Sequence, residues 1–406
     1  MSNHGPEVRE SGSPEVGLPV APAAHPAERT GRRPSDPRTS GPPDFRTPKE
    51  SAARSRISTD LLRIIAMAMV VLIHATAPCE RAIVGGTTWW SMDGLAVAIN
   101  QLGRFCVPVF VALSGYGLAA RHLAGKRDGL LTFARERIGR ILFPYLCISL
   151  VMFAVAGWPG GWSGTLENLA RGRADYHLYF IPLILCCYAF FPLLIRIDSR
   201  ALWWGFLLVL LGFSSPAHTW WAHFGLRLPA LDGWVPHAWL FWFYHGIRLA
   251  YADQRGDPQP GRWTVIVALI AGAAVVGEFA YWATVLPEPG WFDHFHRWVV
   301  VGYSLALLAA WRAWRVGAGL GPRGIAVVGA LAGWSFTVYL GHTWVLRVVE
   351  RSPLAPWPLA VGVATIAVTV FCAWVLSDGL PGRWLRRAAG LGDGQRPANT
   401  KTPHST

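Results

Sequence analysis

The chain has 406 residues, of which 52% are hydrophobic and only 15% are charged. Soluble domains carry about 25% charged residues, so this composition predicts a membrane protein and argues against a soluble enzyme. The net charge of +13 would suit a nucleic-acid partner. The basic residues recur where apolar segments end, however, which is typical of cytoplasmic anchoring. We therefore expect the lipid bilayer as a partner and no nucleic acid.

Residues 1–56 are rich in Pro, Ser, Gly and Arg and show no apolar periodicity. We interpret them as a disordered cytoplasmic arm, and residues 385–406 as a disordered cytoplasmic tail. Residues 57–384 between them are expected to form one transmembrane domain.

Regularly spaced apolar segments predict an all-α, polytopic membrane protein with about ten transmembrane helices. Every second connection is the more basic one, which places both termini in the cytoplasm. Pro108, Pro182 and Pro192 are expected to kink or interrupt their helices. The predicted spans lie near residues 58–78, 98–120, 138–157, 177–196, 201–217, 236–252, 263–285, 297–314, 325–347 and 356–378.

The first apolar segment carries Asp60, Arg63 and His74. Arg63 and His74 are eleven residues apart, so they share one helix face about 16 Å apart along the axis. An arginine near a helix end can extend to the headgroups, whereas a histidine at mid-membrane should face protein or a wet cavity. The histidine could simply pack between helices. Alternatively, a neutral imidazole there could remove a proton from an attacking hydroxyl.

Arg137 and Arg140 are expected on one face at a cytoplasmic helix start. Two guanidinium groups there suit a phosphate-rich ligand, although positive-inside anchoring would place arginines there as well. Farther along the chain, Glu278, His342 and His245 are polar residues inside apolar segments, and each has a structural alternative in an inter-helix hydrogen bond. The six cysteines are scattered, and no metal-ligand spacing is present, so we expect no metal.

Several ordered segments resemble the acyltransferase 3 family of integral membrane acyltransferases. The first is the pattern of Asp60, Arg63 and His74. Others are a VPxF and Ser-Gly segment, an Arg-x-x-Arg motif, a His-Leu-x-Phe segment with Tyr179 at the usual Trp position, and a late Ser to His segment. These matching segments are residues 60–74, 103–116, 137–145, 176–182 and 335–342.

The resemblance implies transfer of an acyl group, commonly acetyl, from cytoplasmic acyl-coenzyme A to a hydroxyl. His74 would take the catalytic position with Arg63 as its partner and Asp60 beside them, and Arg137 and Arg140 would bind coenzyme A. Glu278 matches no motif and is a catalytic candidate on membrane physics alone. The remaining motif residues are assigned to substrate binding: Ser114, Tyr116, His177, Tyr179 and His342.

We therefore expect a multi-pass enzyme of the bacterial plasma membrane with no bound cofactor, using acyl-CoA as donor substrate. Its acceptor would be a hydroxyl-bearing surface glycan, lipid-linked sugar or exported metabolite. A transporter would share the intramembrane polar residues and the kinked helices. A non-catalytic envelope-assembly subunit is the other alternative. The sequence does not specify an oligomeric state.

Overall fold

The chain divides into two units, Met1–Arg46 and Thr47–Thr406. A computed structural model describes part of the second unit, with side chains from Arg56 onward. Throughout this part of the chain the regular elements are helices, joined by turns and short extended segments. The described residues are 48–126, 129–213, 224–225, 237–285, 295–314, 320–379 and 388–391.

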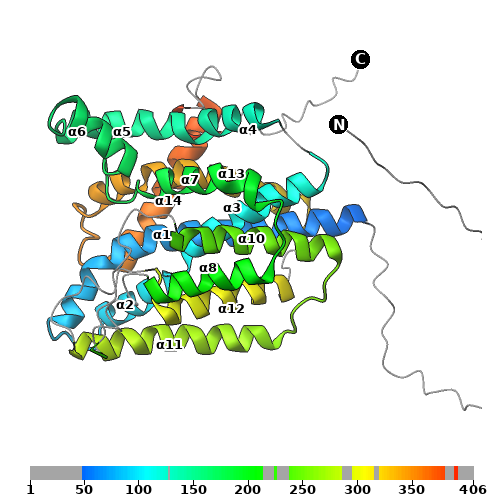
Figure 1. The fold of residues 1–406 in the computed structure, drawn as a ribbon. Helices are drawn as coiled ribbons and strands as arrows, with labels where there is room; N and C mark the ends of the chain where they lie inside the picture. The colour runs from blue at the N-terminus through cyan, green and yellow to red at the C-terminus, as the bar shows by residue number, and fades with distance from the viewer. Residues whose placement is uncertain are drawn as a thin grey trace, which may run out of the picture. The chain divides into compact units, whose positions relative to one another are not determined.

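The helices run largely side by side (Figure 1). A π-helical segment, η1, joins α4 to α5. In chain order the elements are α1 (Pro48–Val84), α2 (Met92–Gly103), α3 (Cys106–Leu123), α4 (Leu130–Arg137), η1 (Ile138–Leu142), α5 (Phe143–Ala156), α6 (Gly161–Arg171), α7 (Phe180–Leu194), α8 (Arg200–Phe213), α10 (His237–Arg255), α11 (Trp263–Val285), α12 (Trp298–Trp314), α13 (Pro322–Val349) and α14 (Pro358–Gly379).

Each of the ten predicted spans falls on helical structure. Among the described residues, six helical stretches are long and apolar enough to cross a membrane, and α7, α8 and α12 are shorter apolar helices. The molecule is thus an all-helical, multi-pass membrane protein, and ten crossings with both termini in the cytoplasm stay a prediction. The six stretches are Arg56–Val84, Met92–Leu123, Leu130–Ala156, Trp263–Val285, Pro322–Val349 and Pro358–Ser377.

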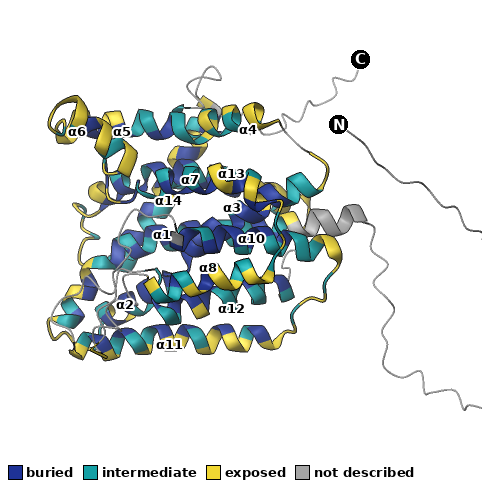
Figure 2. Ribbon diagram, viewed as in Figure 1, coloured by how far each residue is buried: buried dark blue, intermediate teal, exposed yellow. Residues whose placement is uncertain are grey.

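Helix α1 lies at the centre of the packing, in contact with α2, α3, α13 and α14. Helices α1, α3 and α10 carry few exposed residues, whereas α11 presents a largely exposed flank (Figure 2). An apolar helix that is buried nearly all round belongs to the core of a bundle, and one with an exposed apolar flank suits a lipid-facing position. The residues of α1 are therefore in position to build an internal site.

Helices α3 and α10 approach so closely that their backbones touch at two glycines. A Cβ at Gly115 would overlap the carbonyl oxygen of Phe243, and a Cβ at Gly246 would overlap that of Ala112. Small residues allow such approaches between membrane helices. Gly115 of the Ser-Gly segment therefore has a packing role. His245, which precedes Gly246, accepts a hydrogen bond from Trp203 Nε1 of α8 at 3.0 Å. This bond confirms the expected inter-helix contact.

We expect Gly246→Ala to destabilise the protein by about 2–3 kcal/mol, because the new methyl group would force α3 and α10 apart. Thermal unfolding of the detergent-purified protein should show this as a lowered midpoint. Gly205→Ala is the matched control, because nothing lies within 4 Å of a Cβ built there on α8. Equal unfolding midpoints for the two variants would contradict the close packing.

The first two predicted spans differ from the structure in where they end and break. Helix α1 begins at Pro48, inside the expected arm, and continues through Pro78 to Val84, so Cys79 is buried within a helix and does not lie in a loop. The second span breaks at the turn between α2 and α3, not at Pro108, which lies in the first turn of α3. Proline is tolerated in a first helical turn because the amide hydrogens there have no intrahelical acceptor. The expected arm before residue 48 and most of the expected tail lie outside the described residues.

Candidate active site

His74 lies in a cluster of aromatic rings contributed by α1, α13 and the turn before α7. Its ring centroid is 4.8 Å from that of Tyr176 and 5.3 Å from that of His342, which stacks on it. His177 adds a third imidazole, 4.9 Å from His342. The structure therefore brings together three histidines that are expected in the site from separate segments of the sequence. We call these four residues the histidine cluster.

A tight turn places Tyr176 and His177 against α1. Helix α6 ends at Arg171 and is capped by Gly172, whose φ of 66° is left-handed and suits glycine. A side chain at Gly172 would also collide with the backbone of Tyr179, 2.5 Å from the position of the Cβ. The chain therefore folds back tightly after α6 and enters α7 directly after the two site residues.

Asp175 fastens this turn to α13. Its carboxylate accepts hydrogen bonds from Thr343 Oγ1 and Arg347, each at 3.0 Å, and from its neighbour's amide, Tyr176 N, at 2.8 Å. Its Oδ2 lies 3.7 Å from Nδ1 of His177. Asp175 is buried, whereas Arg347 is exposed at the edge of the site. A buried carboxylate with three donors fixes the loop, since leaving such a group unpaired would be costly.

Several imidazole nitrogens in the cluster have no hydrogen-bond partner. Nε2 of His342 and both ring nitrogens of His177 are buried and form no hydrogen bond by geometry, although Asp175 lies near His177 Nδ1, and His342 Nδ1 lies 2.7 Å from the Tyr339 carbonyl oxygen. Buried polar atoms are nearly always satisfied, so unpaired ones near each other favour a polar ligand. The described residues contain no group of His, Cys, Asp or Glu arranged to hold a metal ion.

A second polar group lies farther toward the start of α1. Arg63 donates to Asp60 Oδ1 at 3.0 Å, as their spacing of three residues predicts. Tyr188 of α7 lies within electrostatic range of both Arg63 and Arg137. The guanidinium of Arg137 is 5.5 Å from the centre of the Tyr188 ring and 5.2 Å from that of Phe133. One tyrosine therefore links the start of α1 to the Arg-x-x-Arg motif.

Arg137 and Arg140 were expected to share a face at a helix start, but the structure places them differently. Arg137 ends α4 with a largely covered side chain, whereas Arg140 is exposed within η1. A π segment has i→i+5 hydrogen bonds, so residues three apart turn away from each other more than in an α-helix. Such segments often occur at functional sites. The pair would therefore hold a ligand from two directions.

The other motif residues are divided among different neighbourhoods. Ser114 Oγ donates to the Phe110 carbonyl at 2.9 Å and lies beside Tyr188. Tyr179 packs against the main hydrophobic core, within electrostatic range of Arg104. The hydroxyl of Tyr116 donates to Asp253 of α10 at 2.9 Å, where Arg312 also binds. Tyr116 thus forms inter-helix contacts away from the histidines.

Glu278 is paired with Arg297, which precedes α12, at 3.1 Å. Arg297 also donates to Gln101, which bonds Glu80, and Arg104 binds Glu80 at 2.7 Å. Glu278 therefore belongs to a buried ionic network between α1, α2 and α11, and the contacts described for it lie outside the histidine cluster. Sequence reasoning identified the costly carboxylate but did not pair it with the arginine at the start of the following span.

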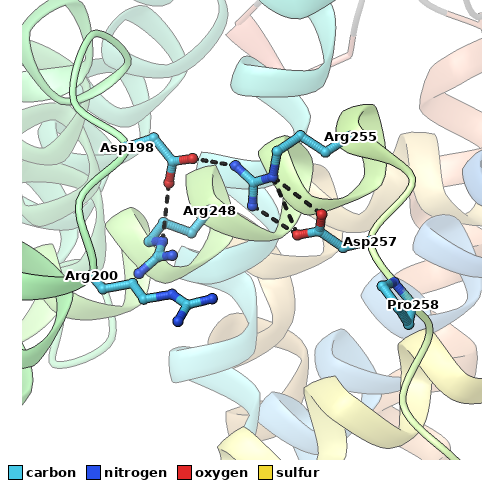
Figure 3. Close-up of a pocket in the computed structure, with 6 residues that line it drawn as sticks. All are labelled: Asp198, Arg200, Arg248, Arg255, Asp257 and Pro258. Carbon is cyan, nitrogen blue, oxygen red and sulfur yellow. Dashed lines mark hydrogen bonds and ion pairs between the residues drawn. The ribbon is translucent and has the colours of Figure 1, made fainter.

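A separate open pocket of about 510 Å³ lies where α10 ends and α8 begins (Figure 3). Asp198 binds both Arg248, at 3.3 Å, and Arg255, and Asp257 accepts from Arg255 at 2.8 Å. The Arg255 guanidinium lowers the pKa of the Asp257 carboxyl. The carboxylates already occupy two of the arginines, and the pocket contains no histidine. The histidine cluster is therefore the better candidate for chemistry.

Four residues of the candidate site were not among the predicted site residues: Tyr176, Asp175, Arg347 and Tyr188. Asp175 and Arg347 are bonded across 172 positions of the chain, and Tyr188 is an ordinary tyrosine in an apolar helix. One signal was available for Arg347, an arginine near the end of an apolar segment only five residues after His342. The corresponding signal for Asp175 was a carboxylate two residues before the motif histidine, His177.

The fold and the cluster define a multi-pass helical membrane protein with a polar site inside its helix bundle. Residues 56–378 match the family described as "Acyltransferase domain". This is most of the chain, which therefore belongs to the acyltransferase 3 family. The chain is also 26% identical over 225 residues to a heme A synthase of Rhodospirillum centenum, covering 53% of the chain. It spans only about half, 54%, of that relative. No solved structure matches it.

Proposed function

We propose that the protein transfers an acyl group, acetyl in the simplest case, from cytoplasmic acyl-CoA to a hydroxyl of an envelope or exported acceptor. The acceptor would be a surface glycan, a lipid-linked sugar or an exported metabolite, and the membrane would be the bacterial plasma membrane. Membership of the acyltransferase 3 family supports the reaction class. The observation that carries the proposal is the arrangement of His74 with buried, unpaired imidazole nitrogens, on the helix that also carries Arg63.

The donor would enter at the start of α1. The phosphates of coenzyme A are anionic, and guanidinium groups bind phosphate oxygens in two-pronged fashion. Arg137 would supply one such group beside Tyr188 and Arg63, and exposed Arg140 would supply another from η1. The pantetheine arm would then extend along α1 over the roughly 16 Å between Arg63 and His74. The thioester would reach the histidines without moving the whole donor across the membrane.

The acceptor would approach from the C-terminal end of α13. Arg347 lies five residues beyond His342 and is exposed, as is Tyr176, whose side chain touches His74. An exposed aromatic ring with a neighbouring charged group suits a ligand that has both apolar faces and hydroxyls, as sugars do. With both termini in the cytoplasm and ten crossings, this end of the site would face away from the cytoplasm.

The reaction would need only groups already placed in the cluster. The acceptor hydroxyl attacks the thioester carbonyl while His74 removes its proton. The oxygen–carbon bond forms and the carbon–sulfur bond breaks, and the proton passes to the departing coenzyme A sulfur. The imidazoles of His177 and His342 would bind the acceptor or the carbonyl oxygen as it gains charge.

Two other functions remain as outcomes of the test. Mass spectrometry should compare surface glycans and exported metabolites from cells with the wild-type protein, with His74→Ala and without the protein. We expect one species to lose an acyl group in both altered strains. A species that is acylated normally but accumulates inside the cell without the protein would favour a transporter. Normal acylation with His74→Ala but not without the protein would favour an assembly subunit.

Replacing both Arg137 and Arg140 with alanine should weaken acyl-CoA binding about tenfold or more. Hydrogen bonds to charged groups contribute about 1.5–3 kcal/mol each, and 1.4 kcal/mol corresponds to tenfold in affinity. Titration calorimetry of the purified protein would measure the dissociation constant at two salt concentrations, since screening should weaken binding to the wild-type protein.

Arg171→Ala is the matched control for this double variant. It removes an exposed arginine whose partner is Glu167, at 3.4 Å, far along the chain from the motif. Lysine at positions 137 and 140 should restore binding only in part, because a point charge lacks the planar fork. Unchanged affinity in the double alanine variant would make the two arginines topological anchors only.

A further inference from the structure

Helix α1 has a built-in weak point beside His74. Pro78 lies inside the helix and has no amide hydrogen to donate to the carbonyl of residue 74, four positions earlier. The proline ring also crowds that carbonyl, so a helix is most easily bent at this turn. His74, the proposed general base, therefore lies on the turn of α1 that lacks a backbone hydrogen bond at Pro78.

Asn100 of α2 binds this turn from the side. Its Nδ2 donates to the Ile73 carbonyl oxygen at 2.9 Å and lies 3.1 Å from Thr76 Oγ1. Thr76 in turn donates to the carbonyl of Leu72, at 2.7 Å. These bonds lie immediately before and after His74 in the chain. Asn100 is fully buried, so each bond forms where water does not compete.

The Asn100 amide is itself held in one orientation. Arg104 donates to Asn100 Oδ1 at 2.8 Å and to Glu80 Oε1 at 2.7 Å. Both Arg104 and Glu80 are buried. Because Arg104 can only donate, the oxygen of the amide must face it and the amide nitrogen must face α1. Glu80 also belongs to α1, so the network binds this helix both before and after Pro78.

We propose that Asn100, oriented by Arg104, is a positioning residue that holds the Pro78-weakened turn of α1 and thereby keeps His74 against Tyr176 and His342. This inference rests on the proposed acyl transfer. It assigns Asn100 no contact with substrate. A general base must stand within hydrogen-bond reach of its proton, and a displacement of about 1 Å can cost about 100-fold in rate.

Asn100→Asp tests the proposal with the smallest possible change. Aspartate keeps the shape and the oxygen that Arg104 binds, but it cannot donate to Ile73 or Thr76. We expect kcat for acyl transfer to fall roughly 10- to 100-fold with KM for acyl-CoA unchanged. Hydrogen exchange of the amides of residues 72–78 should increase, because this turn would open more easily. Thr76→Val, which removes one of the two partners, should show the same effects in weaker form.

Tyr244→Phe is the matched control. It removes a hydroxyl that donates to the Ile197 carbonyl at 2.8 Å and accepts from Ser199 N at 3.0 Å, between α10 and the segment before α8. It should leave kcat and exchange at residues 72–78 as they are. If wild-type protein transfers acyl groups and Asn100→Asp and Thr76→Val keep normal kcat, the positioning role is overturned, even where exchange increases. A wild-type protein without transferase activity would instead overturn the proposed function on which the role depends.

Discussion

His74→Ala is expected to lower acyl transfer by about 10²–10⁴-fold while the protein still inserts and folds. That range is the usual loss when a general base is removed. The contacts described for the imidazole are ring packing against Tyr176 and His342. Its removal therefore opens a small space without breaking an ion pair. The measurement is the initial rate of label transfer from acyl-CoA in proteoliposomes, divided by the amount of folded protein.

His245→Ala is the appropriate control for the loss of His74. It also deletes an imidazole from the helix bundle, but one that binds Trp203 between α8 and α10. Its rate per folded molecule should equal that of the wild-type protein, even where its stability is reduced. A near-normal rate for folded His74→Ala would remove the histidine from the mechanism.

Glu80→Ala should destabilise the protein by about 3–5 kcal/mol, the largest stability effect that we expect. Glu80 and Arg104 are 2.7 Å apart, and both side chains are almost fully buried, with exposures of 4% and 5%. Removing one member of such a pair leaves an uncompensated charge in the interior. Unfolding in increasing denaturant, at constant detergent concentration, would give the change in the free energy of unfolding.

A more exposed ion pair provides the comparison. Glu136 lies 3.6 Å from Arg121 and 3.7 Å from Arg137 with 27% of its side chain exposed. Pairs of this kind contribute about 0–1 kcal/mol, so Glu136→Ala should change stability little. Similar losses for Glu80→Ala and Glu136→Ala would show that the buried network does not hold α1.

The sequence could predict features that depend on one helix or one motif. The shared face of Arg63 and His74 follows from helical geometry, the Asp60–Arg63 bond from a spacing of three, and the all-helical membrane class from long apolar runs. The motif segments also drew attention to His177 and His342, which the structure brings into one cluster with His74.

Features that depend on two distant segments could not be predicted in the same way. Nothing local couples Asp175 to Arg347 or Glu278 to Arg297, because these pairs are created by helix packing. The first predicted span ends at residue 78, which is a proline. The helix nevertheless continues past Pro78, because Cys79 and Ile83 pack against α2 and α11. The divergence of Arg137 and Arg140 depends on η1, for which the sequence offers no marker.

Segment η1 has a consequence for how the chain tolerates insertions and deletions. A π segment is equivalent to an α-helix with one additional residue. Deleting Gly139 would let a continuous α-helix form, and α4 would keep its orientation, because four α-helical residues turn the chain by about as much as five π-helical ones. Arg137 would then stay beside Tyr188. Deleting one residue at the start of α5 would instead rotate α4 by about 100° and carry Arg137 away from Tyr188. Single-residue deletions should therefore be tolerated within η1 better than in the helix that follows it.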